Sequence, residues 1–344
     1  MYGKRYIASK ANSDFMPSEN LAETSLKTLN EKSEKAISSF KQAILEDKMS
    51  NAKTNDAIEQ YLSRWKDTTR PGTLALSCEA VGGKLEEVVP LQVALLFIDA
   101  TMDIHDDIID ESIAKRNVKT IYGRLGKETA LLIGNAFMVK GFSHLHKAIK
   151  NLPQARQALI MDSVKAFLLE VVDAHISEAP LKAKKWNVKP ETYLQVLTKK
   201  AADIEGRMKL GAIYGGGSPK EVEALSKAGR NLGTLLVIRA EFVDMFEADE
   251  LANRVEHECL PLPVLYTLQN KMCEKKIRRI LIEKIGKNNC ENIVAIVQKS
   301  KEVLILQDYL NKLEEEAIRS LCTLRESQAK NDLRLVVASM LEDL

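Results

Sequence analysis

The chain has 344 residues, of which 45% are hydrophobic and 28% are charged, so it is long enough to build a substantial apolar core. Its 50 lysines and arginines nearly cancel its 48 aspartates and glutamates, which leaves a net charge of +2 and no broad basic surface for nucleic acid or anionic membrane. The small numbers of glycines (16) and prolines (9) and the 5% of aromatic residues exclude a collagen-like chain and argue against an all-β or disordered protein.

Apolar residues recur at helical spacing along almost the whole chain, and no run of strict alternation indicates a strand. Helices are therefore predicted near residues 20–47, 53–66, 73–82, 86–112, 126–150, 154–179, 190–214, 219–247, 261–270, 274–285, 290–300, 302–326 and 330–342. No shift of composition marks a domain boundary, and no repeat indicates a solenoid. We expect a flexible N-terminal segment over residues 1–20, followed by a single all-helical domain over residues 21–344.

Two interhelical segments carry clear turn signals. The glycines Gly215–Gly217 are followed by Ser218, then a proline, and Glu221 three residues after the serine, which predicts a turn and a capping box at the next helix. The lysine-rich segment Pro180–Pro190 has a proline at both ends and is predicted to be an exposed loop with solvated lysines.

The cysteine pattern and the apolar segments indicate the cellular setting. The 5 cysteines are scattered without a CxxC pair, which disfavours a disulfide framework and a zinc site. The first 20 residues lack the apolar segment of a secretory signal, and the longest apolar run, Val93–Ile98, is far shorter than the roughly 20 residues that cross a bilayer. We expect a cytoplasmic protein without a transmembrane segment.

Four aspartates near the end of one predicted helix form the most informative pattern. Asp103, Asp106, Asp107 and Asp110 stand at positions i, i+3, i+4 and i+7, so a helix presents them on one face. Like charges at this spacing destabilise a helix by about 0.2–0.5 kcal/mol per pair. A bound Mg²⁺, which prefers oxygen ligands, would relieve this repulsion. An acidic, solvated helix end is the alternative.

Basic residues follow these aspartates closely. Lys115 and Arg116 come after a short gap, and Gly126 then opens a helix that reads KETALLIGNAF. A diphosphate held between a metal ion and these cations is a natural ligand. The segment DDIID from Asp106, the segment KRNVKTIYG and the helix with LLIGNAF resemble the trans-isoprenyl diphosphate synthases, the polyprenyl synthetase family, from about residue 70 to residue 264.

The resemblance implies an all-α, single-domain bundle around a central cavity, with two Asp-rich motifs that hold Mg²⁺ and an allylic prenyl diphosphate at its mouth. Asp106, Asp107 and Asp110 would be the metal ligands of the first motif, and the first two would take part in catalysis. Lys115 and Arg116 would hold the diphosphate.

The resemblance also implies roles for residues before and after the first motif. Lys199 stands where the family has a lysine against the allylic diphosphate, and it would be catalytic, although Lys200 leaves the register open by one residue. Arg70 keeps the arginine of a GKxxRP segment that binds isopentenyl diphosphate, but Asp67 replaces its lysine. Asp99 stands where the family has histidine or glutamine, so two carboxylates occur where an anion should bind.

The second Asp-rich motif departs from the family pattern. Its positions hold Ala240 in place of the first aspartate, then Glu241 and Asp244. These two carboxylates lie about one turn apart on a helix, so they could still bind one metal ion. We therefore expect Glu241 and Asp244 to bind Mg²⁺.

The resemblance also bears on product length. In the family, a bulky aromatic residue at the fifth position before the first motif stops the growing chain early. That position is Thr101 here, so we expect Thr101 to line the tail cavity and products of C20 or longer.

The function that this pattern favours is a Mg²⁺-dependent prenyltransferase that condenses an allylic prenyl diphosphate with isopentenyl diphosphate, as a geranylgeranyl or longer polyprenyl diphosphate synthase does. As the family usually is, the protein would be dimeric, either as a homodimer or with a related synthase. The departures keep two alternatives open: a class I terpene synthase-like enzyme that acts on one allylic diphosphate, and a non-catalytic regulatory subunit of a heteromeric synthase. No nucleic-acid partner is expected.

Overall fold

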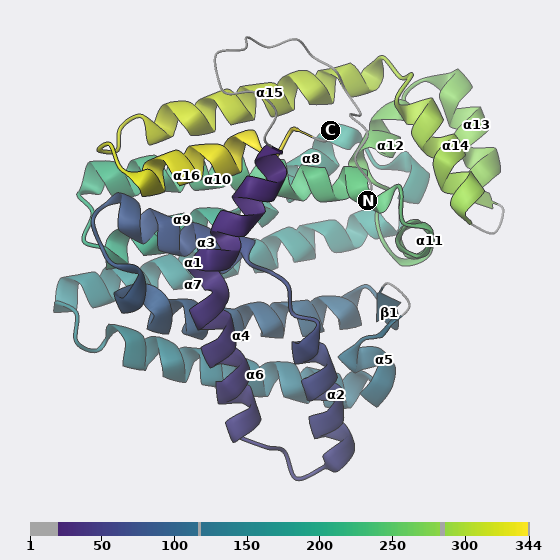
Figure 1. Ribbon diagram of the computed structural model, residues 1–344. Coiled ribbons are helices and arrows are strands. Elements are labelled where there is room, and N and C mark those ends of the chain that lie inside the picture. Colours follow the sequence, from purple (N-terminus) through teal and green to yellow (C-terminus); the bar gives the residue numbers. More distant parts are fainter. Residues whose placement is uncertain (1–19, 116–117, 283–285, 343–344) are drawn as a thin grey trace.

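The computed structural model describes residues 20–115, 118–282 and 286–342 (Figure 1). The N-terminal segment expected to be flexible therefore lies outside the described residues, apart from Asn20, which caps the first helix. The first part of the chain forms α1 (Leu21–Glu46), α2 (Ala52–Ser63), α3 (Thr69–Ala80), α4 (Leu85–Ile109), α5 (Ile121–Leu125), α6 (Lys127–Ile149), α7 (Gln154–Lys182), the 3₁₀ turn η1 (Lys185–Asn187), α8 (Pro190–Lys200) and α9 (Ala202–Tyr214).

The second part of the chain is also helical. It forms α10 (Pro219–Asp244), α11 (Ala248–His257), α12 (Leu262–Thr267), α13 (Lys271–Ile282), α14 (Lys287–Val297), α15 (Glu302–Leu321) and α16 (Gln328–Ala338). The predicted capping box is present at the start of α10, where the Ser218 side chain accepts from the Glu221 amide and the Glu221 side chain accepts from the Ser218 amide. The all-α fold class predicted from the sequence is confirmed.

The helices pack in layers across the molecule (Figure 1). On one side, α4 packs along α6. On the other side, α10 and α16 both pack against α15. The helices α3, α7 and α9 lie between these two sides, and α1 crosses α3, α4 and α16. The helices α11–α14 gather at one end. This end lies close to the end of α4 that carries the aspartates, so the layers bring distant acidic and basic segments together.

The helix α4 is the central element of the core. Phe97 is buried against Phe40 and Phe137, with ring centroids 5.1 and 6.2 Å apart. By length and composition α4 could cross a membrane, but 78% of its most apolar window is buried inside the protein. Its continuous apolar sequence is thus explained by contact with helices on several sides.

Close contacts between helix backbones place α9 against α3 and α10. A Cβ at Gly211 would come within 2.2 Å of the Leu74 carbonyl oxygen on α3, and a Cβ at Gly233 of α10 would come within 2.7 Å of the Ala201 carbonyl oxygen. Glycine is therefore needed at both positions. This approach brings charged side chains of α3, α9 and α10 to one space.

Some expectations about individual elements are wrong. The helix predicted over residues 190–214 is interrupted at Ala201, beside Gly233. The segment 248–257, for which no helix is predicted, forms α11, and Ala114–Lys115 pairs with Val118–Lys119 as a short antiparallel hairpin. Strands of two residues are too short for an alternation pattern to show.

The lysine-rich loop is also shorter than expected. α7 continues through Pro180 to Lys182, and the Lys182 ammonium forms an ion pair with Asp110. One lysine of this segment therefore reaches the acidic motif and is not solvated.

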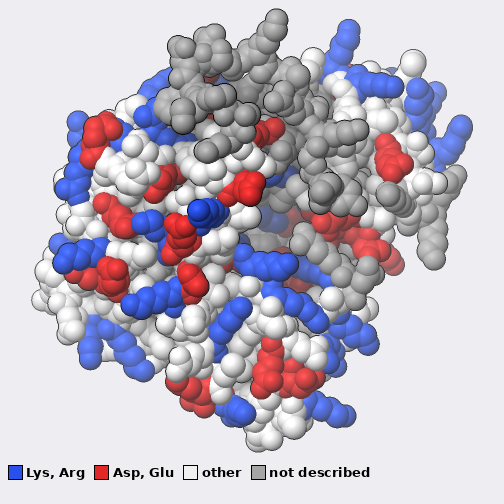
Figure 2. Space-filling model, in the orientation of Figure 1, with Lys and Arg blue, Asp and Glu red and all other residues white. Residues whose placement is uncertain are grey.

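The surface and the thiols agree with the composition. Basic and acidic side chains are mixed over the face seen in Figure 2, as the small net charge predicts. All 5 cysteines are free thiols.

Candidate active site

A cavity of about 480 Å³ opens between α4 and the helices α3, α7, α8, α9, α10 and α11. Its volume is typical of a site for a small molecule. Its lining has two parts: charged side chains, described below, and apolar side chains, namely Met102, Phe167, Leu168, Val171, Leu197, Ile204, Leu236 and Val237. A ligand with a charged head and an apolar tail matches this division.

The first acidic motif presents three of its four aspartates to this cavity. Asp103, Asp106 and Asp110 line it, as their spacing predicts. Burial raises the pKa of Asp103 to about 6, and burial together with the Asp106 charge raises the pKa of Asp110. Negative charge is thus concentrated at the end of α4, where a bound cation would be stabilised.

Asp107 differs from the other motif residues. Its carboxylate lies 2.8 Å from the Lys115 ammonium, and it is not among the residues that line the cavity. The structure therefore places Asp107 as the partner of Lys115, while Asp106 and Asp110 offer oxygens to the cavity. Arg116, the other predicted diphosphate ligand, lies outside the described residues.

Three ammonium groups lie beside the motif: those of Lys115, Lys182 and Lys200. The first pairs with Asp107 and the second with Asp110. The third lies 2.7 Å from Glu178 and lines the cavity, where burial opposes its charge but Glu178 and Asp106 raise its pKa. These ammonium groups provide positive charge for a phosphate ligand.

The register of the predicted lysine is corrected by one residue. Lys199, predicted to contact the diphosphate, lies 2.6 Å from Asp173 and does not line the cavity. Lys200, the alternative in the sequence, does line it. Because consecutive helical residues differ in direction by about 100°, only one of the two can face the site.

His175 stands across from the first motif. Its Nδ1 atom lies 3.6 Å from Asp106 and 3.9 Å from Glu178. Burial and the nearby Lys200 lower the pKa of His175, so the ring is neutral at neutral pH. His175 therefore adds no positive charge beside Asp106.

The donor set at the first motif fits Mg²⁺. Asp106 and Asp110 provide hard oxygen ligands one turn apart on the same wall, and Mg²⁺ in phosphate-binding sites commonly uses one or two carboxylates, waters and the substrate phosphates. No group of three or more His, Cys, Asp or Glu side chains forms a metal-binding cluster within the described residues. A site completed by substrate oxygens does not need such a cluster.

The second acidic motif does not fit a metal ion, contrary to the expectation for Glu241 and Asp244. The Arg254 guanidinium forms ion pairs with both carboxylates. The other Glu241 oxygen accepts from the Leu262 amide at 2.9 Å, and the Tyr193 hydroxyl donates to Glu241 at 3.1 Å. A buried guanidinium thus stands where a metal ion would be needed.

The predicted isopentenyl diphosphate pocket contains a network of arginines and aspartates. Arg70 donates to Asp67 at 2.6 Å and to Asp203, and it lies 3.9 Å from Asp99. Arg207 donates to Asp99 and, at 3.0 and 3.1 Å, to Asp203. Asp67 and Asp99 both line the cavity, so carboxylates are present in this part of it.

Three carboxylates share two guanidinium groups in this network. Burial raises the pKa of Asp99 to about 8, against the effect of Arg207 and Arg70. The pKa of Asp203 is instead lowered to about 2, because the charges and hydrogen bonds of the two arginines outweigh the effect of burial. The Nη1 atom of Arg207 is buried without a hydrogen-bond partner in the described part of the chain.

The expectation for Thr101 is wrong. Its hydroxyl hydrogen-bonds the carbonyl oxygens of Phe97 at 3.0 Å and Gly134 of α6 at 2.9 Å, and it does not line the cavity. Met102, one residue later, does. The sequence therefore placed the cavity lining one residue away from the α4 position that the structure shows there.

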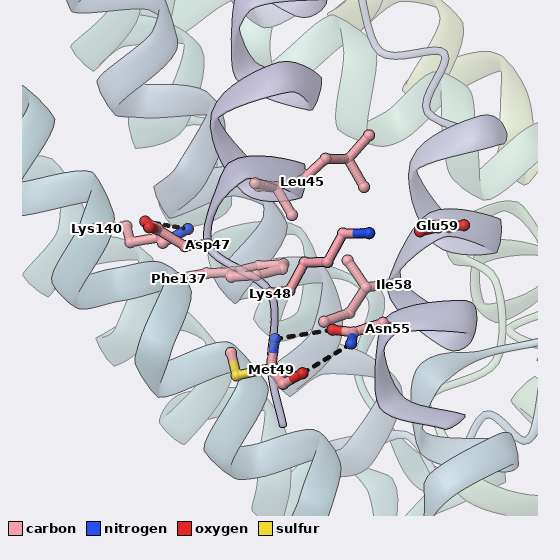
Figure 3. Close-up of a pocket in the computed structure, with 10 residues that line it drawn as sticks. Leu45, Asp47, Lys48, Met49, Asn55, Ile58, Glu59, Phe137 and Lys140 are labelled. Atoms are coloured by element: carbon pink, nitrogen blue, oxygen red, sulfur yellow. Dashed lines mark hydrogen bonds and ion pairs between the residues drawn. The ribbon is translucent and has the colours of Figure 1, made fainter. Parts of the chain in front are cut away.

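A second pocket lies where α1, α2 and α6 meet (Figure 3). Its volume is about 10 Å³. Lys140 points toward Asp47 at 2.9 Å, and Asn55 bonds both the amide and the carbonyl of Met49. These contacts are satisfied within the pocket, which holds together the end of α1 and the start of α2.

Several cavity residues were not singled out from the sequence. Asp203 and Arg207 come from α9, and Arg254 comes from α11. The i, i+4 spacing of Asp203 and Arg207 was a visible signal of an ion pair. Arg254 stands at i, i+4 spacing from Glu258, but its closer partners Glu241 and Asp244 lie on another helix and gave no local signal.

Comparisons with known proteins agree with this geometry. The short chain isoprenyl diphosphate synthase of Methanothermobacter thermautotrophicus is 27% identical over 298 residues, 83% of this chain and 89% of that protein. The large subunit 1 of a heterodimeric geranylgeranyl pyrophosphate synthase of Arabidopsis thaliana is 29% identical over 209 residues, 58% of this chain and 56% of that protein.

A solved structure shows the same fold. The geranylgeranyl pyrophosphate synthetase from Pyrococcus horikoshii superposes with a TM-score of 0.77 at 22% identity and covers 93% of this chain and 98% of that chain. The profile of the polyprenyl synthetase family matches residues 51–300. With its acidic helix end over a partly apolar cavity, this chain belongs to the polyprenyl synthetase family.

Proposed function

We propose that the protein is a Mg²⁺-dependent prenyltransferase that takes an allylic prenyl diphosphate and joins its prenyl group to isopentenyl diphosphate. The observation that carries the proposal is the cavity itself. Asp106, Asp110 and Lys200 meet at its charged part, and apolar side chains such as Leu168 and Leu236 line the rest. This lining matches a diphosphate head and a prenyl tail.

Different residues of the chain would assist the ionisation of such a substrate in different ways. Mg²⁺ bound by Asp106 and Asp110 would neutralise the diphosphate as the carbon–oxygen bond breaks. Lys115, Lys182 and Lys200 place further positive charge beside the leaving group. The apolar lining keeps water from the allylic cation until the double bond of the second substrate attacks it. The new carbon–carbon bond leaves a cation on the added unit, which loses a proton to the released diphosphate and so forms the double bond of the product.

The second substrate would use the arginine network. Its diphosphate would take over Arg70 from Asp67 and Asp203, and the buried Nη1 atom of Arg207 is a further donor. Protonation of Asp99 lowers the negative charge that this diphosphate meets. The network therefore makes binding of isopentenyl diphosphate weaker than in a pocket with unpaired cations.

A second candidate function is that of a regulatory subunit of a heteromeric synthase. The observation that favours it is the same network, because Arg70 is already neutralised by aspartates. A relative named as the large subunit 1 of a heterodimeric synthase supports only the heteromeric assembly that this candidate needs. Such a subunit would bind an allylic diphosphate without elongating it.

We also propose that the protein is dimeric. Large apolar side chains are exposed on α6 and α7, namely Leu131, Leu132, Val139, Phe142, Leu159, Met161, Leu169, Val172 and Ile176. Exposed apolar groups on neighbouring elements are typical of interfaces. A second copy or a related synthase would cover them.

The test is an assay of the purified chain with Mg²⁺, farnesyl diphosphate and radiolabelled isopentenyl diphosphate, followed by chromatography of the products. Incorporation of label into a longer prenyl diphosphate is the expected result. Binding of farnesyl diphosphate without incorporation would favour the regulatory subunit. Release of diphosphate from farnesyl diphosphate alone would favour a terpene synthase-like reaction.

A further inference from the structure

We propose that Arg254 is a built-in cation of the second acidic motif, which takes the place of a divalent metal ion between Glu241 and Asp244. The chain would then bind metal through its first acidic motif alone. The inference rests on the proposed function, because it concerns the same diphosphate site. It starts from the misfit between the second motif and a metal ion.

Arg254 occupies the position that a bridging metal ion would need. It lies on α11, and its side chain is 6% exposed although the residue lines the cavity. Its guanidinium bridges Glu241 and Asp244, which belong to the last turns of α10. One cation therefore joins both carboxylates from the next helix, as a bridging metal ion would from solution.

Hydrogen bonds to the protein hold the Arg254 guanidinium in this position. A guanidinium carries five N–H groups, and here each nitrogen is engaged. Nε donates to Asp244 at 3.0 Å, Nη1 donates to the Tyr193 hydroxyl at 3.0 Å and the Cys259 carbonyl at 3.3 Å, and Nη2 donates to Glu241 and Asp244. The side chain is held from several directions.

This arrangement differs chemically from a metal site. A bound Mg²⁺ keeps positions for water or phosphate oxygens, whereas Arg254 directs its N–H groups to acceptors of the protein. It therefore offsets part of the negative charge of the motif but gives the diphosphate few bonds. A metal ion entering the motif would meet a fixed positive charge beside its own ligands.

The sequence of the second acidic motif agrees with the replacement of a metal ion by Arg254. Ala240 stands where the family pattern has its first aspartate, so the motif keeps two carboxylates, and Glu258 lies 3.7 Å from Arg254 as a further partner. Without an aspartate at position 240, the motif offers a metal ion fewer oxygen ligands than the family pattern does. Ala240 and Arg254 therefore act in the same direction, because the first removes a possible metal ligand and the second occupies the two carboxylates that remain.

The experiment counts bound Mn²⁺ by electron paramagnetic resonance while the full chain is titrated with Mn²⁺ in the presence of inorganic diphosphate. Asp106→Asn with Asp110→Asn should weaken Mn²⁺ binding at least tenfold. Asp244→Asn should leave the number of bound ions unchanged and their affinity within twofold. Loss of an ion in Asp244→Asn would overturn the inference and leave the proposed function intact.

Arg254→Gln supplies the reverse test. With the guanidinium gone, Glu241 and Asp244 should bind an additional Mn²⁺, and adding Asp244→Asn to this variant should remove it. Arg278→Gln is the matched control, because this arginine pairs with Glu274 and stacks on Trp186 away from the cavity. It should bind the same number of ions as the wild type.

Thermal unfolding covers the case in which Arg254→Gln folds poorly. Mn²⁺ with diphosphate should then raise the melting temperature of Arg254→Gln more than that of the wild type, because the ion restores the missing charge. An equal shift in both would contradict the inference. A wild type that binds no Mn²⁺ would contradict the proposed function, and a gain of binding in Arg254→Gln would still support the inference.

Discussion

At the residue scale, neighbouring side chains of the site differ in whether they line the cavity or pair with another charged side chain. Asp106 and Asp110 face the cavity, while Asp107 holds Lys115. In the same way Lys200 lines the cavity and Lys199 holds Asp173. These differences follow from helix geometry, and they can be tested with paired variants.

The pair Lys199 and Lys200 gives the first prediction. Lys200→Gln should weaken binding of farnesyl diphosphate by roughly ten- to a hundredfold, since a hydrogen bond to a charged group contributes about 1.5–3 kcal/mol. Lys199→Gln is the control and should stay within twofold. Isothermal titration calorimetry measures both, and equal losses would show that Lys200 does not meet the diphosphate.

The buried carboxyl of Asp99 gives the second prediction. Burial raises its pKa to about 8 in the folded protein, against an ordinary value of about 3.9 in the unfolded chain. Between these pH values the folded chain binds a proton that the unfolded chain lacks, so the free energy of unfolding falls as pH rises. The slope is at most about 1.4 kcal/mol per pH unit, the limit for one proton.

Urea unfolding from pH 5 to pH 8 measures this slope. Asp99→Asn should flatten it, because the amide cannot ionise and still accepts from Arg207. Asp162→Asn is the control, since Asp162 is exposed and pairs weakly with Lys165 at 3.8 Å. An Asp99→Asn profile parallel to that of the wild type would mean that Asp99 is ionised throughout this range.

At the scale of elements, α6 and α7 differ from the rest of the bundle. Both present buried faces to the core, but both also expose large apolar side chains on the opposite side. A helix that is apolar on two faces is normally buried on both. The two helices therefore indicate a partner surface.

Disruption of this surface gives the third prediction. Val139→Glu with Leu169→Glu should convert the dimer to a monomer, because charged side chains would have to be desolvated in the interface. The control is Met272→Glu on α13, where the side chain is 71% exposed, the same value as for Val139. Light scattering after size-exclusion chromatography gives the mass, and a monomeric wild type would contradict the proposed dimer.

At the scale of the whole molecule, the packing of α4 decides which of its residues meet the prenyl tail. Thr101 is directed to the backbone of α6, whereas Met102 is directed to the space between α4, α7 and α9. The cavity therefore runs along a side of α4 that is fixed by the positions of the neighbouring helices.

The fourth prediction concerns product length in a chain that elongates. Met102→Phe should shorten the main product, since a larger side chain fills the cavity. Thr101→Phe should instead destabilise the fold by about 1–3 kcal/mol through overpacking without a matching shortening. Product chromatography and urea unfolding separate the two effects, and shortening by Thr101→Phe alone would show that the tail follows the α6 side.

The sequence by itself determined the helical architecture and the first acidic motif. Both depend on local information. Apolar spacing predicts a helix, and the spacing of the four aspartates predicts a shared face. The cavity lining includes Asp103, Asp106 and Asp110 but not Asp107. The resemblance to the polyprenyl synthetases, confirmed by the family match, likewise depends on short continuous segments. The predicted cytoplasmic location stays a prediction.

Only the tertiary structure decided which charges compensate one another. Arg254 and Glu241 are 13 residues apart and belong to different helices, and Asp99 and Arg207 are 108 residues apart. No periodicity links such positions, because their contact depends on how α4, α9, α10 and α11 pack. The same packing turned Lys200 and Met102 into the cavity in place of Lys199 and Thr101, since a rotation of one residue on a helix changes the direction of a side chain by about 100°.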